Sequence, residues 1–291
     1  MSLREARPAR NHRRAEPGAR RPQADARDRL ARAEALAAEG RLAQAVHELD
    51  AALAERPDRA PAWQLKGVLA LMQGDAEPAA AALARAAALA PDDAVCRVNL
   101  GIAQHQAGRL DDAEASLRRA LEVQPQLAQA HYNLGVLLRE QARLDQAEAH
   151  LRQAVAAEAS YAKAWLELGR VQRARGALDG ALAALAHVPA LAAAREEAGL
   201  IEHEWGRHEA AIEHLRAALA REPDRPVAAL ALGSCLQQTG QLDAALAVYR
   251  AALARDRSLY GAVLKNLTTA ARGRLWLRPA DLRRALLGDP G

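Results

Sequence analysis

The chain has 291 residues and a net charge of +4; 51% of its residues are hydrophobic, only 3% are aromatic, and Phe is absent. Its core must therefore be built from Ala and Leu, which favours closely packed helices. No apolar run reaches the roughly 18 residues needed to cross a bilayer, and no secretory signal is recognisable. The two cysteines, Cys96 and Cys235, indicate neither a disulfide framework nor a metal site. We expect a cytoplasmic protein without a cofactor.

The positive charge is concentrated at the N-terminus, where residues 1–29 hold nine arginines and four acidic residues. Residues 1–25 lack periodic apolar positions and are predicted to form a disordered, Arg-rich arm. A basic arm can bind nucleic acid, but this one has no interleaved aromatic residues on which bases would stack. Nucleic-acid binding through the arm is therefore the weaker alternative to a solvated tail.

From Leu30 onward, apolar residues recur at helical spacing and small residues recur with a long period. Successive glycines are 34 residues apart except at one step of 30, and each is followed by Ala twelve residues later; they are Gly67, Gly101, Gly135, Gly169, Gly199 and Gly233. This period predicts seven helix–turn–helix units over residues 26–259. The unit at about 162–191 is four residues short, so we expect its second helix to end early at Pro189.

The small residues have a packing role in this prediction. Gly in the first helix and Ala in the second let the two helix axes approach closely, and a Leu such as Leu151 fills the space toward the next hairpin. Replacement of Gly135 or Ala147 by a bulky residue should cost a few kcal/mol by overpacking. Other glycines, such as Gly108, stand between the helices and should supply a left-handed turn.

The pattern decays after Tyr260, and residues 260–291 are predicted to be a degenerate repeat and a C-terminal capping helix. Trp276 lies in a connection that the repeat does not explain. It either covers the last hairpin or is an exposed docking residue.

Three units carry motifs that resemble the tetratricopeptide repeat: Trp63…Leu65-Lys66-Gly67…Ala79…Leu83…Ala86…Pro91, Tyr132-Asn133-Leu134-Gly135…Ala147, and Trp165…Leu168-Gly169…Ala181. The resemblance covers about residues 26–257. It implies an all-α, right-handed superhelical solenoid of about seven repeats, with the first helix of each repeat lining a concave groove. It also implies a protein–protein interaction role.

The groove positions of the first helices include polar residues that could hold a partner. Asn99 and Asn133 occupy equivalent places one repeat apart, and a side-chain amide can both donate to and accept from a peptide backbone. Tyr132 is adjacent. Lys163, Glu167 and Arg170 fall on one helix face, which indicates either a salt-bridged surface or, together with Arg139 and Arg173, a basic mid-groove for acidic peptides or a terminal carboxylate.

Three histidines, His203, His208 and His214, are close in sequence, but their spacing does not place them on one helix face, so we predict no metal site. No nucleophile–base pair or phosphate-binding glycine loop is present either. The sequence therefore predicts a non-catalytic scaffold or adaptor that binds an extended peptide or protein partner in the groove. The alternative is a regulatory or substrate-recruiting subunit of an enzyme system whose transferase or hydroxylase is another chain.

Overall fold

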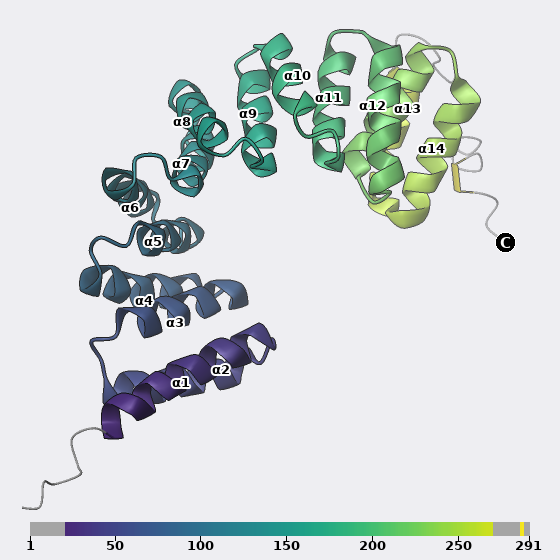
Figure 1. The fold of residues 1–291 in the computed structure, drawn as a ribbon. Coiled ribbons are helices and arrows are strands. Elements are labelled where there is room, and N and C mark those ends of the chain that lie inside the picture. Colours follow the sequence, from purple (N-terminus) through teal and green to yellow (C-terminus); the bar gives the residue numbers. More distant parts are fainter. Residues whose placement is uncertain (1–20, 270–285, 288–291) are drawn as a thin grey trace, which may run out of the picture. The chain divides into compact units, whose positions relative to one another are not determined.

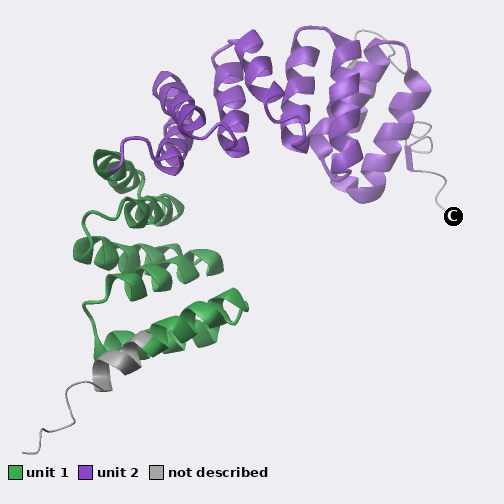
Figure 2. Ribbon diagram, viewed as in Figure 1, with its two compact units in different colours: residues 1–123 green, residues 124–291 purple. Residues whose placement is uncertain are grey.

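The structure, a computed structural model, describes residues 21–269 and 286–287, and these residues contain fifteen α-helices, one short 3₁₀ helix and no strand. The chain divides into two compact units, residues 1–123 and 124–291 (Figure 2). The predicted all-α fold of seven helical hairpins is confirmed. None of the helices in the described ranges is long and apolar enough to cross a membrane.

The first unit contains three hairpins (Figure 1). Their helices are α1 (Arg21–Ala38), α2 (Leu42–Glu55), α3 (Ala60–Gln73), α4 (Ala76–Leu89), α5 (Ala94–Gln106) and α6 (Leu110–Val123). The helix α1 begins at Arg21, so residues 21–25 are helical, although the sequence placed them in a disordered arm. The remainder of the predicted arm, residues 1–20, lies outside the described residues.

The second unit contains four hairpins and the start of an eighth repeat. Its helices are α7 (Ala128–Glu140), α8 (Leu144–Ala157), α9 (Ala162–Ala174), α10 (Leu178–Ala186), α11 (Ala192–Glu204), α12 (His208–Arg221), α13 (Pro226–Gln238), α14 (Leu242–Arg255), the 3₁₀ helix η1 (Arg257–Leu259) and α15 (Tyr260–Thr269). The helix α10 has 9 residues, whereas α8, α12 and α14 have 14 each. The expected short helix is therefore present.

The glycines of the first helices lie against the second helices at van der Waals limits. A Cβ atom on Gly135 would lie 2.7 Å from Cγ of Leu151 and 3.3 Å from the carbonyl oxygen of Ala147. Because contacts this short are not tolerated, the hairpin requires glycine at this position. The last complete hairpin packs Tyr249 against Gly233 instead of a leucine, and the buried tyrosine hydroxyl donates to Oε1 of Gln237 at 2.8 Å.

The turns inside the hairpins use left-handed backbone, as expected. Six of the seven turns place a glycine at φ between 73° and 84°: Gly40, Gly74, Gly108, Gly176, Gly206 and Gly240. In the seventh, Ala142 adopts φ 59°. An L-residue in this region is strained, so α7 and α8 are joined at a conformational cost that the other hairpins avoid.

The C-terminal element α15 repeats the packing of a first helix without its glycine. Val263 and Leu267 are fully buried, and they form one hydrophobic cluster with Leu286 from the end of the chain. The burial of Leu286 supports a C-terminal cap on the last hairpin. Trp276, the predicted docking residue, lies outside the described residues.

Candidate functional site

The first helices of the second unit form one continuous face. The helix α7 contacts α9, α9 contacts α11, and α11 contacts α13, in addition to the contacts within each hairpin. The second helices show no comparable contact with one another within residues 124–269. The hairpins are therefore closer together on the side of the first helices, which we call the inner face.

A chain of alternating charges crosses this face from α7 to α11. We call it the Arg–Glu ladder: Arg139, Glu167, Arg170, Glu197, Arg173 and Glu204. The Nε atom of Arg139 lies 3.0 Å from Oε2 of Glu167, an ion pair without the alignment of a hydrogen bond. Arg170 donates from Nη1 to Oε1 of Glu167 at 2.7 Å and from Nε to Oε1 of Glu197 at 2.9 Å.

The second half of the ladder continues to the end of α11. Arg173 donates from Nη1 to Oε2 of Glu197 at 2.9 Å and also bonds the carboxylate of Glu204. Burial opposes the charge of Arg170, but its hydrogen bonds to Glu197 and Glu167 outweigh that penalty, and its pKa is raised. The six charges sum to zero, so the predicted basic mid-groove is internally neutralised.

Two of the three carboxylates of the ladder, those of Glu167 and Glu197, are more buried than its guanidinium groups, whereas Glu204 at the end of α11 is 46% exposed. The side chain of Glu167 is 9% exposed, whereas those of Arg139 and Arg170 are 33% and 32% exposed. Burial of an unpaired carboxylate would be costly, and two arginines on Glu167 compensate that cost. The glutamates thus fix the arginine side chains at the surface of a cavity of about 610 Å³ that Ala142 and Leu144 also line.

The other predicted groove residues have different positions. Tyr132 is half-buried on α7, and its ring lies 5.0 Å from that of Tyr161. Asn133 donates from Nδ2 to the carbonyl oxygen of Gln129 at 2.7 Å, so its amide donor is engaged within its own helix. Lys163 is exposed and does not join the ladder; Glu167 pairs with arginines instead. Asn99 is half-buried on α5, in the first unit.

The structure brings together two of the three histidines that the sequence could not place on one face. The Nδ1 atoms of His203, at the end of α11, and His208, at the start of α12, lie 3.3 Å apart. Cys235, buried on α13, places Sγ 3.2 Å from Nδ1 of His203, a neighbour that the sequence analysis missed. His214 is elsewhere, with Nδ1 3.1 Å from Nη1 of Arg195.

Both thiols have raised pKa values in these surroundings. Burial and the nearby Asp93 raise the pKa of Cys96 to about 11, and burial raises that of Cys235 to about 12. A thiol with such a pKa is protonated at neutral pH, whereas a catalytic cysteine needs its thiolate. Neither cysteine therefore indicates catalysis.

Two family models described as tetratricopeptide repeat match the chain, one at residues 70–135 and 204–267 and the other at residues 30–94 and 137–198. Together they span most of α1 to α15. The chain belongs to the tetratricopeptide repeat family. Members with this fold are generally interaction scaffolds, so a role in protein binding follows. No curated protein matches the sequence.

Three solved tetratricopeptide-type structures illustrate the likeness in fold. A chain of the APC/C hetero-tetramer Cut9–Hcn1 has a TM-score of 0.63 and 21% identity over 75% of this chain, which spans 44% of that chain. PilW, described as a widely conserved type IV pilus biogenesis factor, has a TM-score of 0.63 and 21% identity over 70% of this chain and 96% of its own. YrrB, described as a TPR protein with an unusual peptide-binding site, has a TM-score of 0.51 and 23% identity over 62% of this chain and 95% of its own.

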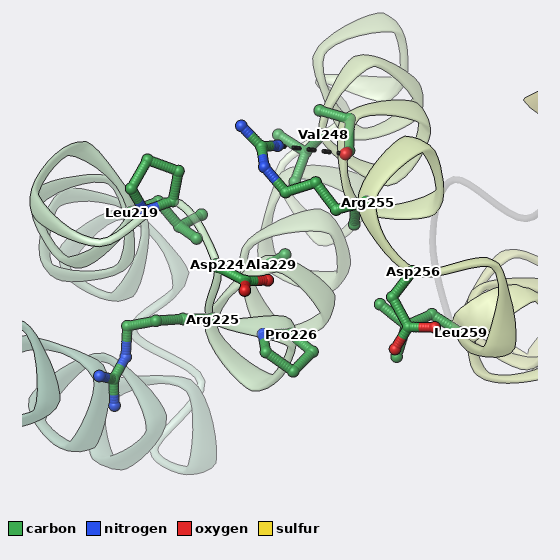
Figure 3. Close-up of a pocket in the computed structure, with 12 residues that line it drawn as sticks. Leu219, Asp224, Arg225, Pro226, Ala229, Val248, Arg255, Asp256 and Leu259 are labelled. Carbon is green, nitrogen blue, oxygen red and sulfur yellow. Dashed lines mark hydrogen bonds between the residues drawn. The ribbon is translucent and has the colours of Figure 1, made fainter.

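Three further cavities follow the tetratricopeptide period and lie away from the ladder. Each has at its edge one of the recurring prolines, Pro91, Pro189 or Pro223. Figure 3 shows the cavity at Pro223, of about 250 Å³, where Ala229, Val248 and Leu259 supply an apolar wall. Because equivalent residues line the three cavities in different repeats, we interpret them as seams between successive hairpins, and the ladder cavity remains the candidate site.

Proposed function

We propose that the protein is a non-catalytic scaffold that binds an extended, acidic peptide segment on the inner face of its second unit. The observation that carries the proposal is the exposure of Arg139, Arg170 and Arg173 around one cavity while buried glutamates hold them in place. A guanidinium group has five N–H donors, and those not bonded to glutamate are free to meet a carboxylate of the partner.

The glutamates support binding by organising the arginines in advance. Immobilisation of a long side chain costs about 0.5–1.5 kcal/mol on association, and the ladder has already immobilised three of them. Because the ladder is neutral as a whole, long-range attraction contributes little. We therefore expect selection by hydrogen-bond geometry, with only a modest dependence of affinity on salt.

The aromatic pair beside the ladder supplies apolar contact area. The ring of Tyr132, on α7, lies 5.0 Å from that of Tyr161, just before α9, and burial together with the nearby charge of Glu167 raises the pKa of Tyr132. Tyrosine gives a large, rigid contact at low conformational cost, which suits a peptide-binding surface. Asn133 and Lys163 extend this surface along the first helices, and Asn99 offers an equivalent amide in the first unit.

The experiment measures fluorescence polarisation of labelled ten-residue peptides that alternate Glu with Ala, or Gln with Ala. We expect the wild-type protein to bind the acidic peptides. The double variant Asn133→Ala, Arg170→Gln should bind them about tenfold more weakly, since one charge-assisted hydrogen bond contributes about 1.5–3 kcal/mol. The control is Arg216→Gln, an exposed arginine on α12 outside the cavity.

Two results would reject the proposal. Equal affinity of the wild type and the double variant would exclude the inner face as the site. Tighter binding of the Gln peptides than of the Glu peptides would exclude recognition of acidic segments. Circular dichroism of each variant verifies that the helices are intact.

A further inference from the structure

Three potential metal ligands converge at the junction of α11, α12 and α13. His203, His208 and Cys235 each offer one ligand atom, a ring nitrogen or Sγ, and these three atoms all lie within 4.8 Å of one another. The Nδ1 atoms of the two histidines lie 3.3 Å apart, and Sγ of Cys235 lies 3.2 Å from Nδ1 of His203. A tetrahedral zinc ion, with Zn–N of about 2.0–2.1 Å and Zn–S of about 2.3 Å, separates such ligands by about 3.3–3.6 Å.

A single two-centre hydrogen bond cannot join all three of these atoms. A neutral imidazole has one acceptor lone pair, and here both His208 and Cys235 face the same Nδ1 atom of His203. If that nitrogen accepts from one neighbour, the other is left without a partner there. A cation between the three atoms would use all three lone pairs at once.

The sequence departs from the repeat at two of these three positions. The place of His208, the first residue of the second helix, holds an apolar residue in every other hairpin: Leu42, Ala76, Leu110, Leu144, Leu178 and Leu242. The place of Cys235 holds a buried aliphatic residue in the first helices α3 to α11: Leu69, Ala103, Leu137, Val171 and Ile201. Departures from a local rule concentrate at functional sites, and here two occur in adjacent repeats and touch the same histidine.

We propose that His203, His208 and Cys235 bind a borderline-soft divalent cation, of which zinc is the best fit, with water in the fourth position. Imidazole nitrogen and thiolate sulfur are the ligands that zinc prefers. Binding requires loss of the thiol proton of Cys235 to solvent, and the positive charge of the ion compensates that loss. Since the ligands come from three helices of two successive repeats, the ion would fasten these repeats together. This inference is independent of peptide binding by the ladder.

The histidines of the site remain accessible to solvent. Both histidines are half-buried, which leaves a route for the ion and for the water that completes its coordination.

The test begins with the full-length protein freed of metal by a chelator and then dialysed. Isothermal titration with Zn²⁺ should show one tight site per chain, and Co²⁺ should give the intense charge-transfer absorption of a cobalt–thiolate bond. The melting temperature should rise with added Zn²⁺, because a ligand that binds only the folded state stabilises it.

Matched variants distinguish the site from adventitious binding. Cys235→Ser should abolish the charge-transfer band, and Cys96→Ser, which removes the only other thiol, should retain it. His208→Leu restores the residue found in most other hairpins, so it should fold at least as well as the metal-free wild type and yet lose binding by about 100-fold or more. His214→Gln is the histidine control and should bind as the wild type does.

The proposal is overturned if the wild type binds no Zn²⁺ stoichiometrically. It is also overturned if His208→Leu binds with unchanged affinity, or if the cobalt band persists in Cys235→Ser. Because His208→Leu follows the repeat pattern, loss of binding in that variant cannot be attributed to unfolding when its helix content and melting temperature equal those of the metal-free wild type.

Discussion

Trp165 donates its indole N–H to the carbonyl oxygen of Ala159, six residues earlier, at 2.9 Å. The same bond from the first helix to the preceding loop recurs at 2.9–3.2 Å in four other repeats, from Trp63 to Pro57, Arg97 to Pro91, His131 to Pro125 and Arg195 to Pro189. Residues as different as Trp, Arg and His share the position because each has an N–H group that reaches this carbonyl. The bond fixes where each first helix begins.

Ala229 occupies this position in the repeat of α13 and cannot make the bond, and the apolar cavity of Figure 3 lies beside it. We predict that Ala229→Arg forms the missing bond to the carbonyl oxygen of Pro223 and raises the free energy of unfolding by about 0.5–1.5 kcal/mol. Chemical denaturation measures the change. Ala229→Met, which fills similar space without an N–H donor, is the control; an equal gain in both variants would attribute the effect to packing alone.

Gly135 and Gly261 should respond in opposite directions to the same substitution. Gly135→Ala places Cβ 2.7 Å from Cγ of Leu151, so we expect a loss of about 1–3 kcal/mol in unfolding free energy. Gly261, on α15, has nothing within 4 Å of an added Cβ, so Gly261→Ala should gain up to about 1 kcal/mol from helix propensity. Urea titrations of both variants test the pair, and a neutral Gly135→Ala would contradict the close approach of α7 and α8.

The repeat period made the fold predictable because helix packing distance restricts particular positions to particular sizes. The position of Gly135 requires a small residue because the second helix of the hairpin lies so close to it. That constraint is visible in the sequence without knowledge of any contact. The first helix α1 was harder to delimit: residues 21–25 carry no apolar period, and yet they continue the helix.

The candidate site was predictable only in part. The arginines and the pairing of Arg170 with Glu167 followed from helical spacing, but the glutamates of the next first helix were not identified as partners. Arg170 pairs with Glu197, 27 residues away, and this depends on the register between adjacent hairpins. The contact of Cys235 with His203 was missed for the same reason, because it too depends on the register between hairpins. The sequence did contain one signal of an unusual site: His208 occupies a position at which the other second helices begin with an apolar residue.

Ala142 is the one described non-glycine residue with positive φ, at 59°, and it lines the ladder cavity. Relief of this strain by Ala142→Gly should stabilise the protein by about 0.5–1 kcal/mol, because the gain of about 1–2 kcal/mol in the folded state is partly offset by the greater freedom of glycine in the unfolded state. The matched substitution is Gly108→Ala at φ 75°, where an added Cβ meets nothing within 4 Å, so only backbone strain should appear as a loss. Thermal unfolding of both variants tests the prediction, and destabilisation by Ala142→Gly would refute it.

His214 should make the protein less stable in mild acid. Burial and the charge of Arg195 lower its pKa in the folded state, whereas Glu202 and Glu213 act in the opposite direction. Below pH about 6.5, the ordinary pKa of histidine, the unfolded chain therefore binds a proton at His214 more readily than the folded chain does. The free energy of unfolding falls as the pH decreases from that value toward the lowered pKa of the folded state.

The measurement compares unfolding free energies at pH 7.5 and 5.5 in the presence of a chelator. We expect His214→Gln to lose less stability than the wild type over this interval, since glutamine cannot take up the proton. His47→Gln, at an exposed position on α2, serves as the control for removal of a histidine without burial. If His214→Gln loses as much stability as the wild type and His47→Gln do, His214 does not contribute to the acid sensitivity.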